Sequence, residues 1–202
     1  MGKFIVVEGL DGSGKGTQIK RLKKNIEALG RRVSVSAEPT DGYAGKMCRE
    51  VLSGEKKVSA ETLAAFFAAD RICHNEDIEK LLFSGYDVIS DRYYYSSCAY
   101  QGMGDEEKMK WIYKMNRGCG KIRQPDICIF LDVDADECME RIEKGRDKKE
   151  IYEKADVLRK VRASFMKTFE IFDEKNVFII DSNGDEDTVE KRIWDAVKNN
   201  LS

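Results

Sequence analysis

A short segment near the start of the chain has residue types and spacing that suit phosphate binding. It follows the apolar run Phe4–Val7, leads into a segment with helical spacing, and matches the pattern G-x-x-x-x-G-K. Glycines let the backbone N–H groups turn into one concavity, the helix adds its positive dipole end, and a lysine can reach the β- and γ-phosphates. We therefore expect a nucleotide phosphate site built from Gly9, Leu10, Asp11, Gly12, Ser13, Gly14, Lys15, Gly16 and Thr17.

The loop departs from the usual pattern directly after its lysine. Gly16 stands where a serine or threonine commonly holds Mg²⁺, and Thr17 comes next. This G-K-G-T ending resembles that of adenylate kinase and its relatives, in which Mg²⁺ is held largely through water and nucleotide oxygens. The departure argues against direct Mg²⁺ ligation by the loop, and we expect Thr17 on the α-phosphate side.

Two arginines in or directly after predicted elements are expected beside the same loop. Arg71 lies on a long helical segment, and Arg92 directly follows a predicted strand. Planar guanidinium groups hold phosphoryl oxygens and offset charge in a transition state. A regulatory GTPase should instead carry D-x-x-G and N-K-x-D stretches after its strands, and we find neither at the expected places. The arginines favour a kinase over a switch.

Five apolar, β-branched runs alternate with helical segments, which predicts right-handed βαβ units. We expect an α/β fold of the P-loop NTPase class, a three-layer sandwich with a five-stranded parallel sheet flanked by helices. The predicted strands are Phe4–Val7, Val33–Ser36, Asp87–Ser90, Ile127–Leu131 and Val177–Ile180. The predicted helices are Gln18–Leu29, Ala60–Phe83, Asp105–Asn116, Asp156–Asp173 and Thr188–Leu201.

Length and composition fit a single domain over residues 1–202. The 35 basic and 37 acidic residues give a net charge of −2, which argues against nucleic acid or an anionic membrane as the main partner. No segment has the apolar length of a membrane span or a secretory signal. The six cysteines are spread singly and indicate free thiols in a reducing cytoplasm. We interpret His74 as a surface or helix-cap residue.

Four further stretches carry a specific resemblance. They are Glu38–Gly42, Phe67–Arg71, Asp91–Gly102 and Gln124–Asp126, and with the loop they run collinearly from residue 3 to about residue 182. This pattern resembles the thymidylate kinase family of P-loop nucleoside monophosphate kinases. The resemblance implies transfer of the ATP γ-phosphate to dTMP with Mg²⁺, giving dTDP and ADP for dTTP synthesis. It also implies a homodimer that associates through helices on one side of the sheet. A kinase for dUMP or AMP and a P-loop nucleotide-binding switch remain the alternatives.

The same resemblance implies roles for the residues near the acceptor phosphate. Asp11 would accept a hydrogen bond from the sugar 3′-hydroxyl, and Arg92 would clamp the dTMP phosphate. Pro39 lies where the chain bends to admit that phosphate. Asp91 would order Mg²⁺ through water or orient Arg92. The family often has an arginine where this chain has Ala37, so a phosphate contact from that position is lost.

Base and sugar contacts follow in the same way. Phe67 would stack on thymine, Arg71 would bond its carbonyl edge, and Ser97 would meet the base. Tyr100 would lie against the deoxyribose and leave little room for a 2′-hydroxyl, with Gln101 in the same pocket. The ordinary alternatives are a core aromatic for Phe67 and helix-surface ion pairs for the arginines.

A charged, loop-like stretch at 140–154 includes the place of the family's lid, residues 141–154. Closure would exclude water and bring a cation to the transferred phosphoryl group. The family's D-R-x-E lid motif appears here as 150–153 without its arginine. Arg146 is our expected catalytic cation, acting with Lys15, Arg92 and Asp11, and Lys148 or Lys149 could replace it. The turn 181–184 either borders the adenine of ATP or is an ordinary turn.

Overall fold

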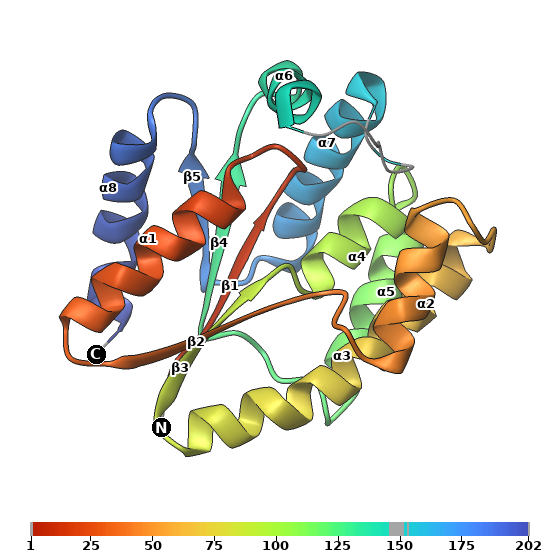
Figure 1. Ribbon diagram of the computed structural model, residues 1–202. Coiled ribbons are helices and arrows are strands. Elements are labelled where there is room, and N and C mark those ends of the chain that lie inside the picture. The colour runs from red at the N-terminus through yellow and green to blue at the C-terminus, as the bar shows by residue number, and fades with distance from the viewer. Residues whose placement is uncertain (1, 146–151, 153, 202) are drawn as a thin grey trace.

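The structure, a computed structural model, describes residues 2–145, 152 and 154–201, and the side chains of 144 and 145 are not described. Within these described residues, five parallel strands form one sheet in the order β2-β3-β1-β4-β5 (Figure 1). The strands are β1 Phe4–Gly9, β2 Arg32–Ala37, β3 Tyr86–Asp91, β4 Ile127–Asp132 and β5 Val177–Asp181. The predicted parallel sheet is confirmed, and each predicted strand extends by one or two residues.

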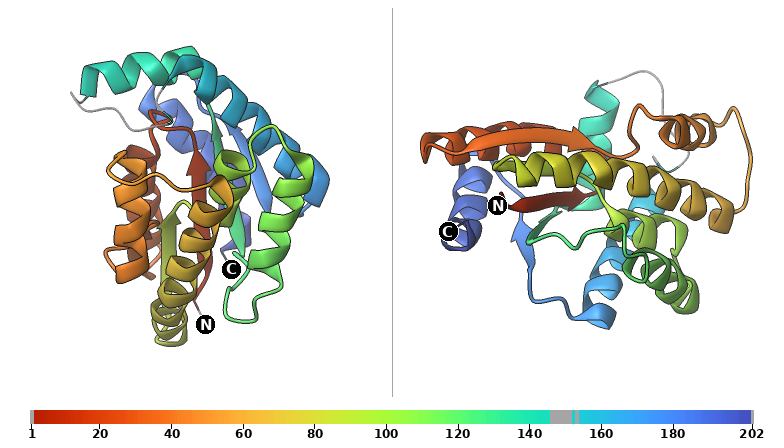
Figure 2. Two further views of the ribbon diagram at one scale, coloured as in Figure 1. Left: turned by 90° about the vertical axis from the view of Figure 1, so that its right-hand side faces the viewer. Right: turned by 90° about the horizontal axis from the view of Figure 1, so that it is seen from below.

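Helices cover both faces of this sheet, which confirms the three-layer architecture. The helices are α1 Lys15–Ala28, α2 Tyr43–Leu52, α3 Ala60–Phe83, α4 Tyr94–Gln101, α5 Glu106–Arg117, α6 Ala135–Gly145, α7 Ala155–Phe172 and α8 Glu186–Val197, followed by a short 3₁₀ helix at Lys198–Asn200. Figures 1 and 2 show α1 and α8 on one face, with α3, α4 and α7 on the other. α2 packs on α3, and α5 packs on α4.

The side chains of β1 alternate between two separate cores. Phe4 and Val6 pack with the helices of the α3, α4 and α7 layer, while Ile5 and Val7 pack with α1 and α8. All four side chains are buried, and burying each contributes about 2 kcal/mol to the free energy of unfolding. Burial on both faces explains why this strand reads as a continuous apolar run in the sequence.

The carboxyl ends of the strands place the functional loops side by side. β1 lies between β3 on one side and β4 on the other, so the chain crosses the sheet in opposite directions from this strand. A crevice forms at such a switch point outside the carboxyl ends of the strands. The loop after Gly9 opens there, beside Asp91 at the end of β3 and Ala37 at the end of β2.

Three helices were not predicted from the sequence. α4 has no polar face, because all eight of its residues are buried, so helical periodicity is absent. α2 is short and carries a glycine, Gly45, in its first turn. α6 continues to Gly145, so the expectation of a loop from residue 140 was wrong for residues 140–145.

Two further observations complete the description of the fold. The peptide bond between Glu38 and Pro39 is cis. Over the residues that the structure describes, no helix combines the length and the apolar character that crossing a bilayer requires.

Candidate active site

The phosphate loop joins β1 to α1 through a compact turn. Gly12 and Gly14 have φ angles of 80° and 88°, which L-residues rarely adopt. The Ser13 N–H donates to the Leu10 carbonyl at 3.2 Å, which closes the turn. The Lys15 ammonium folds back and donates to the carbonyl oxygens of Leu10 at 2.8 Å and Gly9 at 3.2 Å. Burial lowers the pKa of Lys15.

α6 supports this loop from outside. A Cβ placed on Gly12 would lie 2.4 Å from the carbonyl oxygen of Cys138, so the loop backbone packs directly on the helix. Arg141, also on α6, places Nη1 3.4 Å from the Gly12 carbonyl oxygen and forms an ion pair with Glu137. One cation of the predicted lid range therefore already lies over the phosphate loop.

A cavity of about 350 Å³ opens in front of the loop. It is lined by Asp11, Gly12, Gly14, Lys15, Gly16, Thr17, Ala37, Glu38, Asp91 and Arg92. Gly9, Leu10 and Ser13 are not in its lining, and the Leu10 side chain is buried in the core. The expected cup thus exists, and Leu10 contributes to it through backbone geometry alone.

Asp91 lines the same cavity, and one oxygen of its carboxylate lacks a hydrogen-bond partner among the described residues. This oxygen, Oδ1, is buried. Carboxylate oxygens and water are the ligands that Mg²⁺ prefers, and this ion usually keeps several waters. The described residues hold no group of three or more metal-ligating side chains. The site therefore fits a Mg²⁺ ion held mainly by nucleotide oxygens and water, with Asp91 beside it.

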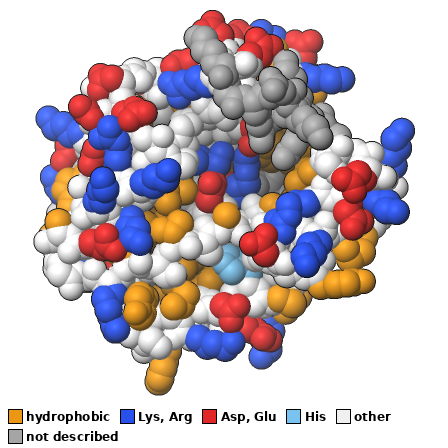
Figure 3. Space-filling view, viewed as in Figure 1, with side chains coloured by type: hydrophobic (Ala, Val, Ile, Leu, Met, Phe, Trp, Pro, Cys, Tyr) orange, Lys and Arg blue, Asp and Glu red, His pale blue; other side chains and the backbone are white. Residues whose placement is uncertain are grey.

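A second cavity, of about 310 Å³, adjoins the first. Its lining contains all eight residues predicted to bind the acceptor: Asp11, Pro39, Phe67, Arg71, Arg92, Ser97, Tyr100 and Gln101. Asp11 and Arg92 line both cavities. Figure 3 shows that this side of the molecule is hollowed and that Lys and Arg side chains gather in the hollow.

Arg92 lies at the boundary between the two cavities. Its φ angle is 73°, an uncommon value for a residue other than glycine and a local strain of the kind that functional sites hold. Its Nη2 lies 2.6 Å from Asp11 Oδ1, and its Nη1 lies 3.2 Å from the Gly9 carbonyl oxygen. Burial acts to raise the pKa of Asp11, but the charges of Arg92 and Lys15 outweigh it and hold that pKa at about 2. Asp11 and Arg92 therefore form a charged pair at neutral pH.

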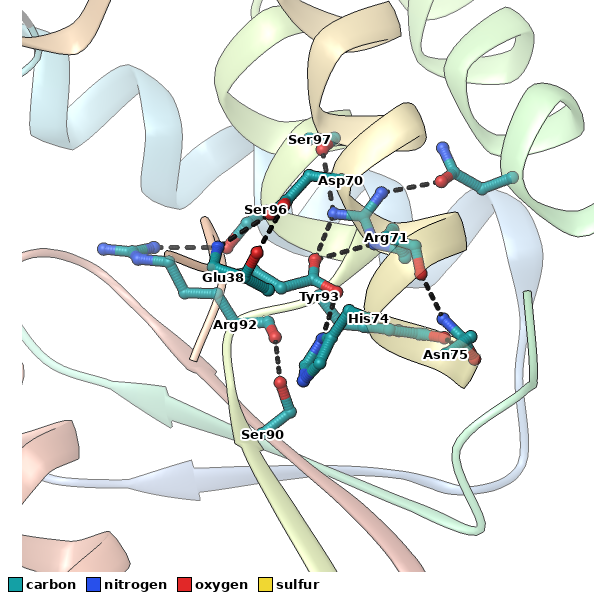
Figure 4. Close-up of polar contacts among 12 residues, drawn as sticks. Glu38, Asp70, Arg71, His74, Asn75, Ser90, Arg92, Tyr93, Ser96 and Ser97 are labelled. Atoms are coloured by element: carbon teal, nitrogen blue, oxygen red, sulfur yellow. Dashed lines mark hydrogen bonds and ion pairs between the residues drawn. The ribbon is translucent and has the colours of Figure 1, made fainter. Parts of the chain in front are cut away.

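Arg71 is fixed on three sides and is not a helix-surface residue (Figure 4). Its Nε donates to Glu38 at 2.8 Å, and its Nη1 donates to Asn116 at 2.6 Å. Its Nη2 lies 3.4 Å from Ser97 Oγ. Burial opposes the charge, but Glu38 raises the pKa of Arg71. The guanidinium is thus a preset, charged donor in the wall of the second cavity.

His74 corrects our expectation of a surface or cap residue. Its side chain is 7% exposed, and its Nδ1 lies 3.0 Å from Glu38 Oε1. Glu38 therefore bridges His74 and Arg71, as Figure 4 shows. Three positions separate the two partners on α3, which places them on one helix face. This spacing of Arg71 and His74 was the sequence feature that could have indicated a shared partner.

Aromatic side chains complete the second cavity. The Tyr100 hydroxyl donates to Asp11 Oδ2 at 3.2 Å, which fixes its ring beside the carboxylate. Phe67 is half-buried and lines the cavity while packing on the α2–α3 core, so it is not a core residue alone. Tyr152 packs edge-on against Tyr100, with ring centroids 5.1 Å apart, and its hydroxyl lies 3.4 Å from Gln101 Nε2.

Our expected lid cation cannot be placed. Arg146, Lys148 and Lys149 lie outside the described residues. The turn 181–184 does lie at the carboxyl edge of the sheet, where Arg192 bonds the carbonyl oxygens of Asp181 and Asn183.

Comparison with known proteins decides the family. The family model described as thymidylate kinase matches residues 7–193. The chain belongs to the thymidylate kinase family. Members of this family are nucleoside monophosphate kinases, so the chain is a phosphotransferase.

Relatives in the thymidylate kinase family span nearly the same length. A "probable thymidylate kinase" of Methanococcus aeolicus is 41% identical over 200 residues, covering 98% of this chain and 95% of that protein. One of Thermococcus kodakarensis is 41% identical over 199 residues, with 94% of both chains covered. The structure of thymidylate kinase from Candida albicans superposes with a TM-score of 0.81 at 25% identity, covering 98% of this chain and 92% of that one.

Sequence reasoning assigned no role to several residues of this thymidylate kinase site. Asn116 carried no signal, because an asparagine near a helix end is usually a cap or a surface residue. Tyr152 falls within the charged stretch 140–154, where the sequence indicates only a lid. Glu8 did carry a signal, since a charged residue within a buried strand needs a specific partner.

Proposed function

We propose that this chain transfers the γ-phosphate of ATP to dTMP, giving dTDP and ADP. One observation carries the proposal. All eight residues expected to hold the acceptor line one cavity, and two of them, Asp11 and Arg92, also line the phosphate-loop cavity. A donor phosphate in one cavity and an acceptor phosphate in the other would therefore meet at this pair.

ATP is assigned to the phosphate-loop cavity. The backbone of residues 9–17 would bind the phosphates at the N-terminus of α1. Lys15 would leave the carbonyl oxygens of Gly9 and Leu10, which it contacts now, for the β- and γ-phosphates. Thr17 lines the same cavity and is assigned to the α-phosphate side.

The dTMP phosphate is assigned to Arg92, and its sugar to Asp11 and Tyr100. Asp11 would accept a hydrogen bond from the 3′-hydroxyl. The Tyr100 ring, fixed by its bond to Asp11, would crowd a 2′-hydroxyl. Pro39 lines the same cavity as Arg92 and is assigned to the bend that admits the phosphate.

Thymine is assigned to the far end of the same cavity. Phe67 offers an apolar face for stacking on the ring. Arg71 would donate to a carbonyl oxygen of the base, and Ser97 and Gln101 would contact its edge. Gln101 Oε1 is buried without a hydrogen-bond partner among the described residues, which leaves an acceptor for the base N–H.

Mg²⁺ would be held beside Asp91 through water. When bound, it would offset the negative charge of the ATP phosphates. The chain's own residues would do the remaining work. Lys15 and Arg92 would hold the two phosphates in line, and no general base is required because the attacking phosphate oxygen is already anionic.

We assign residues 1–202 to one domain whose lid is about 141–154. Closure over ATP would exclude water from the transfer. Arg146 remains the proposed catalytic cation of the lid. Arg141 and Tyr152 support the assignment, because Arg141 contacts the phosphate loop and Tyr152 contacts Tyr100 in the acceptor cavity.

A panel assay tests the proposal. ADP release is measured with ATP, Mg²⁺ and, in turn, dTMP, dUMP, AMP or no acceptor. We expect turnover with dTMP to exceed turnover with every other acceptor. A preference for dUMP or AMP would establish the related kinase. Binding of ATP without acceptor-dependent turnover would establish a nucleotide-binding switch.

We also propose a cytoplasmic homodimer that associates through helices on one side of the sheet. The apolar stretch Leu63–Phe67 on α3 is the candidate contact. Leu63 packs within its own chain against Cys48 and Val51, whereas Ala65 on the same helix is exposed. Light scattering would give the mass in solution, and a mass near 23.1 kDa would exclude the dimer.

A further inference from the structure

The carboxylate of Glu8 is fully buried in β1, one residue before the phosphate loop begins at Gly9. Glu8 has no exposed surface and lies in a strand that is otherwise apolar until Gly9. A buried ionised carboxylate is costly unless several hydrogen bonds compensate it. Its partners therefore indicate why the chain keeps a glutamate at this position.

Among the described residues, the Glu8 carboxylate accepts hydrogen bonds from the N-cap residue of α4 and from its first turn. Oε1 accepts from the backbone N–H groups of Tyr93 at 2.9 Å and Ser96 at 3.1 Å. Oε2 accepts from the Ser96 hydroxyl at 2.5 Å. The first N–H groups of a helix lack partners within the helix. Glu8 thus caps a helix that is distant in sequence and begins two residues after Arg92.

Ser96 links this carboxylate to the phosphate clamp. Arg92 Nη1 donates to Ser96 Oγ at 3.1 Å, a contact that Figure 4 shows, and the Ser96 hydroxyl donates onward to Glu8. Because a serine hydroxyl has one hydrogen, its donation to Glu8 leaves its lone pairs directed elsewhere, toward the arginine. The orientation of the hydroxyl therefore depends on an accepting oxygen at Glu8.

We propose that Glu8 is a positioning residue for phosphoryl transfer, which orients Arg92 toward the acceptor phosphate by fixing the direction of the Ser96 hydroxyl. The inference rests on the proposed function, because it needs Arg92 to bind that phosphate. Glu8 lines neither cavity and touches no substrate in this scheme.

The charge state of Glu8 then controls the clamp. Burial raises the pKa of Glu8 to about 7, against the hydrogen bond of Ser96 and the charge of Arg92, which lower it. A proton on Oε2 would turn that oxygen into a donor and displace the Ser96 hydrogen. The titratable groups that act on Glu8, or on which it acts, are Lys15 on α1, Arg71 on α3, Arg92 after β3, Cys98 on α4 and Cys128 on β4.

The test compares the wild type with Glu8→Gln across pH 6 to 9. Glutamine keeps the shape and the Oε1 acceptor but places an N–H₂ donor opposite Ser96. We expect kcat/KM for dTMP to fall about tenfold at pH 8.5, as for loss of a hydrogen bond to a charged group. The ratio of kcat/KM between the two enzymes should approach 1 near pH 6, where Glu8 of the wild type is itself protonated. Ionisation of dTMP cancels in this ratio.

Two serine variants separate positioning from a general effect on the fold. Ser96→Ala removes the relay, and Ser96→Thr keeps a hydroxyl. We expect Ser96→Ala to lower kcat/KM for dTMP and Ser96→Thr to restore it at least in part. If Glu8 acts through Ser96, the double variant Glu8→Gln with Ser96→Ala should lose less than the product of the two single losses. KM for ATP should change less than KM for dTMP in each.

The inference would be overturned if the ratio of kcat/KM for dTMP between the wild type and Glu8→Gln stayed constant across this pH range and the losses in the double variant were additive. Equal changes in KM for ATP and in KM for dTMP would also overturn it, since they indicate a purely structural role. Failure of the proposed function looks different, because the wild type itself would then show no turnover that depends on dTMP.

Discussion

The carboxylate of Asp11 and the guanidinium of Arg92 lie 2.6 Å apart, one on the phosphate loop and one after β3. Both side chains line both cavities, so the pair stands where donor and acceptor phosphates would meet. Arg92 is held by the pair and by hydrogen bonds to the Gly9 carbonyl oxygen and Ser96 Oγ, and is thus oriented before any substrate binds. Such preorganisation lowers the cost of aligning two anions.

Replacing Asp11 by asparagine tests the sugar assignment. Asparagine can still accept one hydrogen bond, but it loses the ion pair with Arg92. We expect kcat/KM for dTMP to fall between about tenfold and a hundredfold, the range for hydrogen bonds to charged groups. The loss should be smaller with 3′-deoxy-dTMP, which lacks the hydroxyl. Asp195→Asn, which removes an exposed pair with Lys198, is the matched control. An identical loss for both substrates would argue against the sugar contact.

Replacing Lys15 by methionine tests the donor site. Methionine has a similar length but no charge for the β- and γ-phosphates. We expect kcat to fall by at least about a hundredfold, as when a charge-stabilising group is removed from a transition state. Circular dichroism should show an unchanged fold. Lys20→Met, on the exposed face of the same helix, is the control. Near-normal turnover of Lys15→Met would contradict the donor assignment.

Replacing Gly12 by alanine tests the packing of the loop on α6. The new Cβ would lie 2.4 Å from the Cys138 carbonyl oxygen, at a φ angle of 80°. We expect the free energy of unfolding in urea to fall by about 1–3 kcal/mol. A Cβ on Gly16 meets nothing within 4 Å, so Gly16→Ala should leave stability unchanged or raise it. Equal stability of the two variants would show that α6 does not confine the loop.

The raised pKa of Glu8 predicts a pH dependence of stability. The folded chain keeps the Glu8 proton up to about pH 7, whereas the unfolded chain releases it near the ordinary value of 4.5. Stability from this group is therefore full below pH 4.5 and is lost as pH rises through 7. The unfolding free energy of the wild type minus that of Glu8→Gln should fall by ~3 kcal/mol across that window. Urea titrations at several pH values measure it, and a flat difference would mean that Glu8 is ionised in both states.

The sheet and the long helices could be predicted because their periodicity is strong. β1 reads as a buried strand from its apolar run, and Ala60–Phe83 was predicted with the bounds that α3 has. α4 could not be recognised, because a fully buried helix has no polar face. Its position follows from tertiary contacts such as the hydrogen bonds that Tyr93 and Ser96 donate to Glu8, which no local sequence pattern contains.

The acceptor residues were predicted through family motifs, but their supports were not. Arg71 was expected at the base, whereas Asn116, which accepts its hydrogen bond, comes from another helix 45 residues away. His74 was misread because a single histidine on a helix usually needs no buried partner. Glu38 supplies one only after β2 and α3 have come together. Such contacts depend on the packing of elements and not on local spacing.

The most direct test follows the transferred phosphate itself. The enzyme is mixed with γ-³²P-labelled ATP, Mg²⁺ and excess dTMP, and the nucleotides are separated by chromatography. We predict that the label appears in dTDP as fast as ADP forms. Label in inorganic phosphate, or ADP formation that is independent of dTMP, would contradict the account.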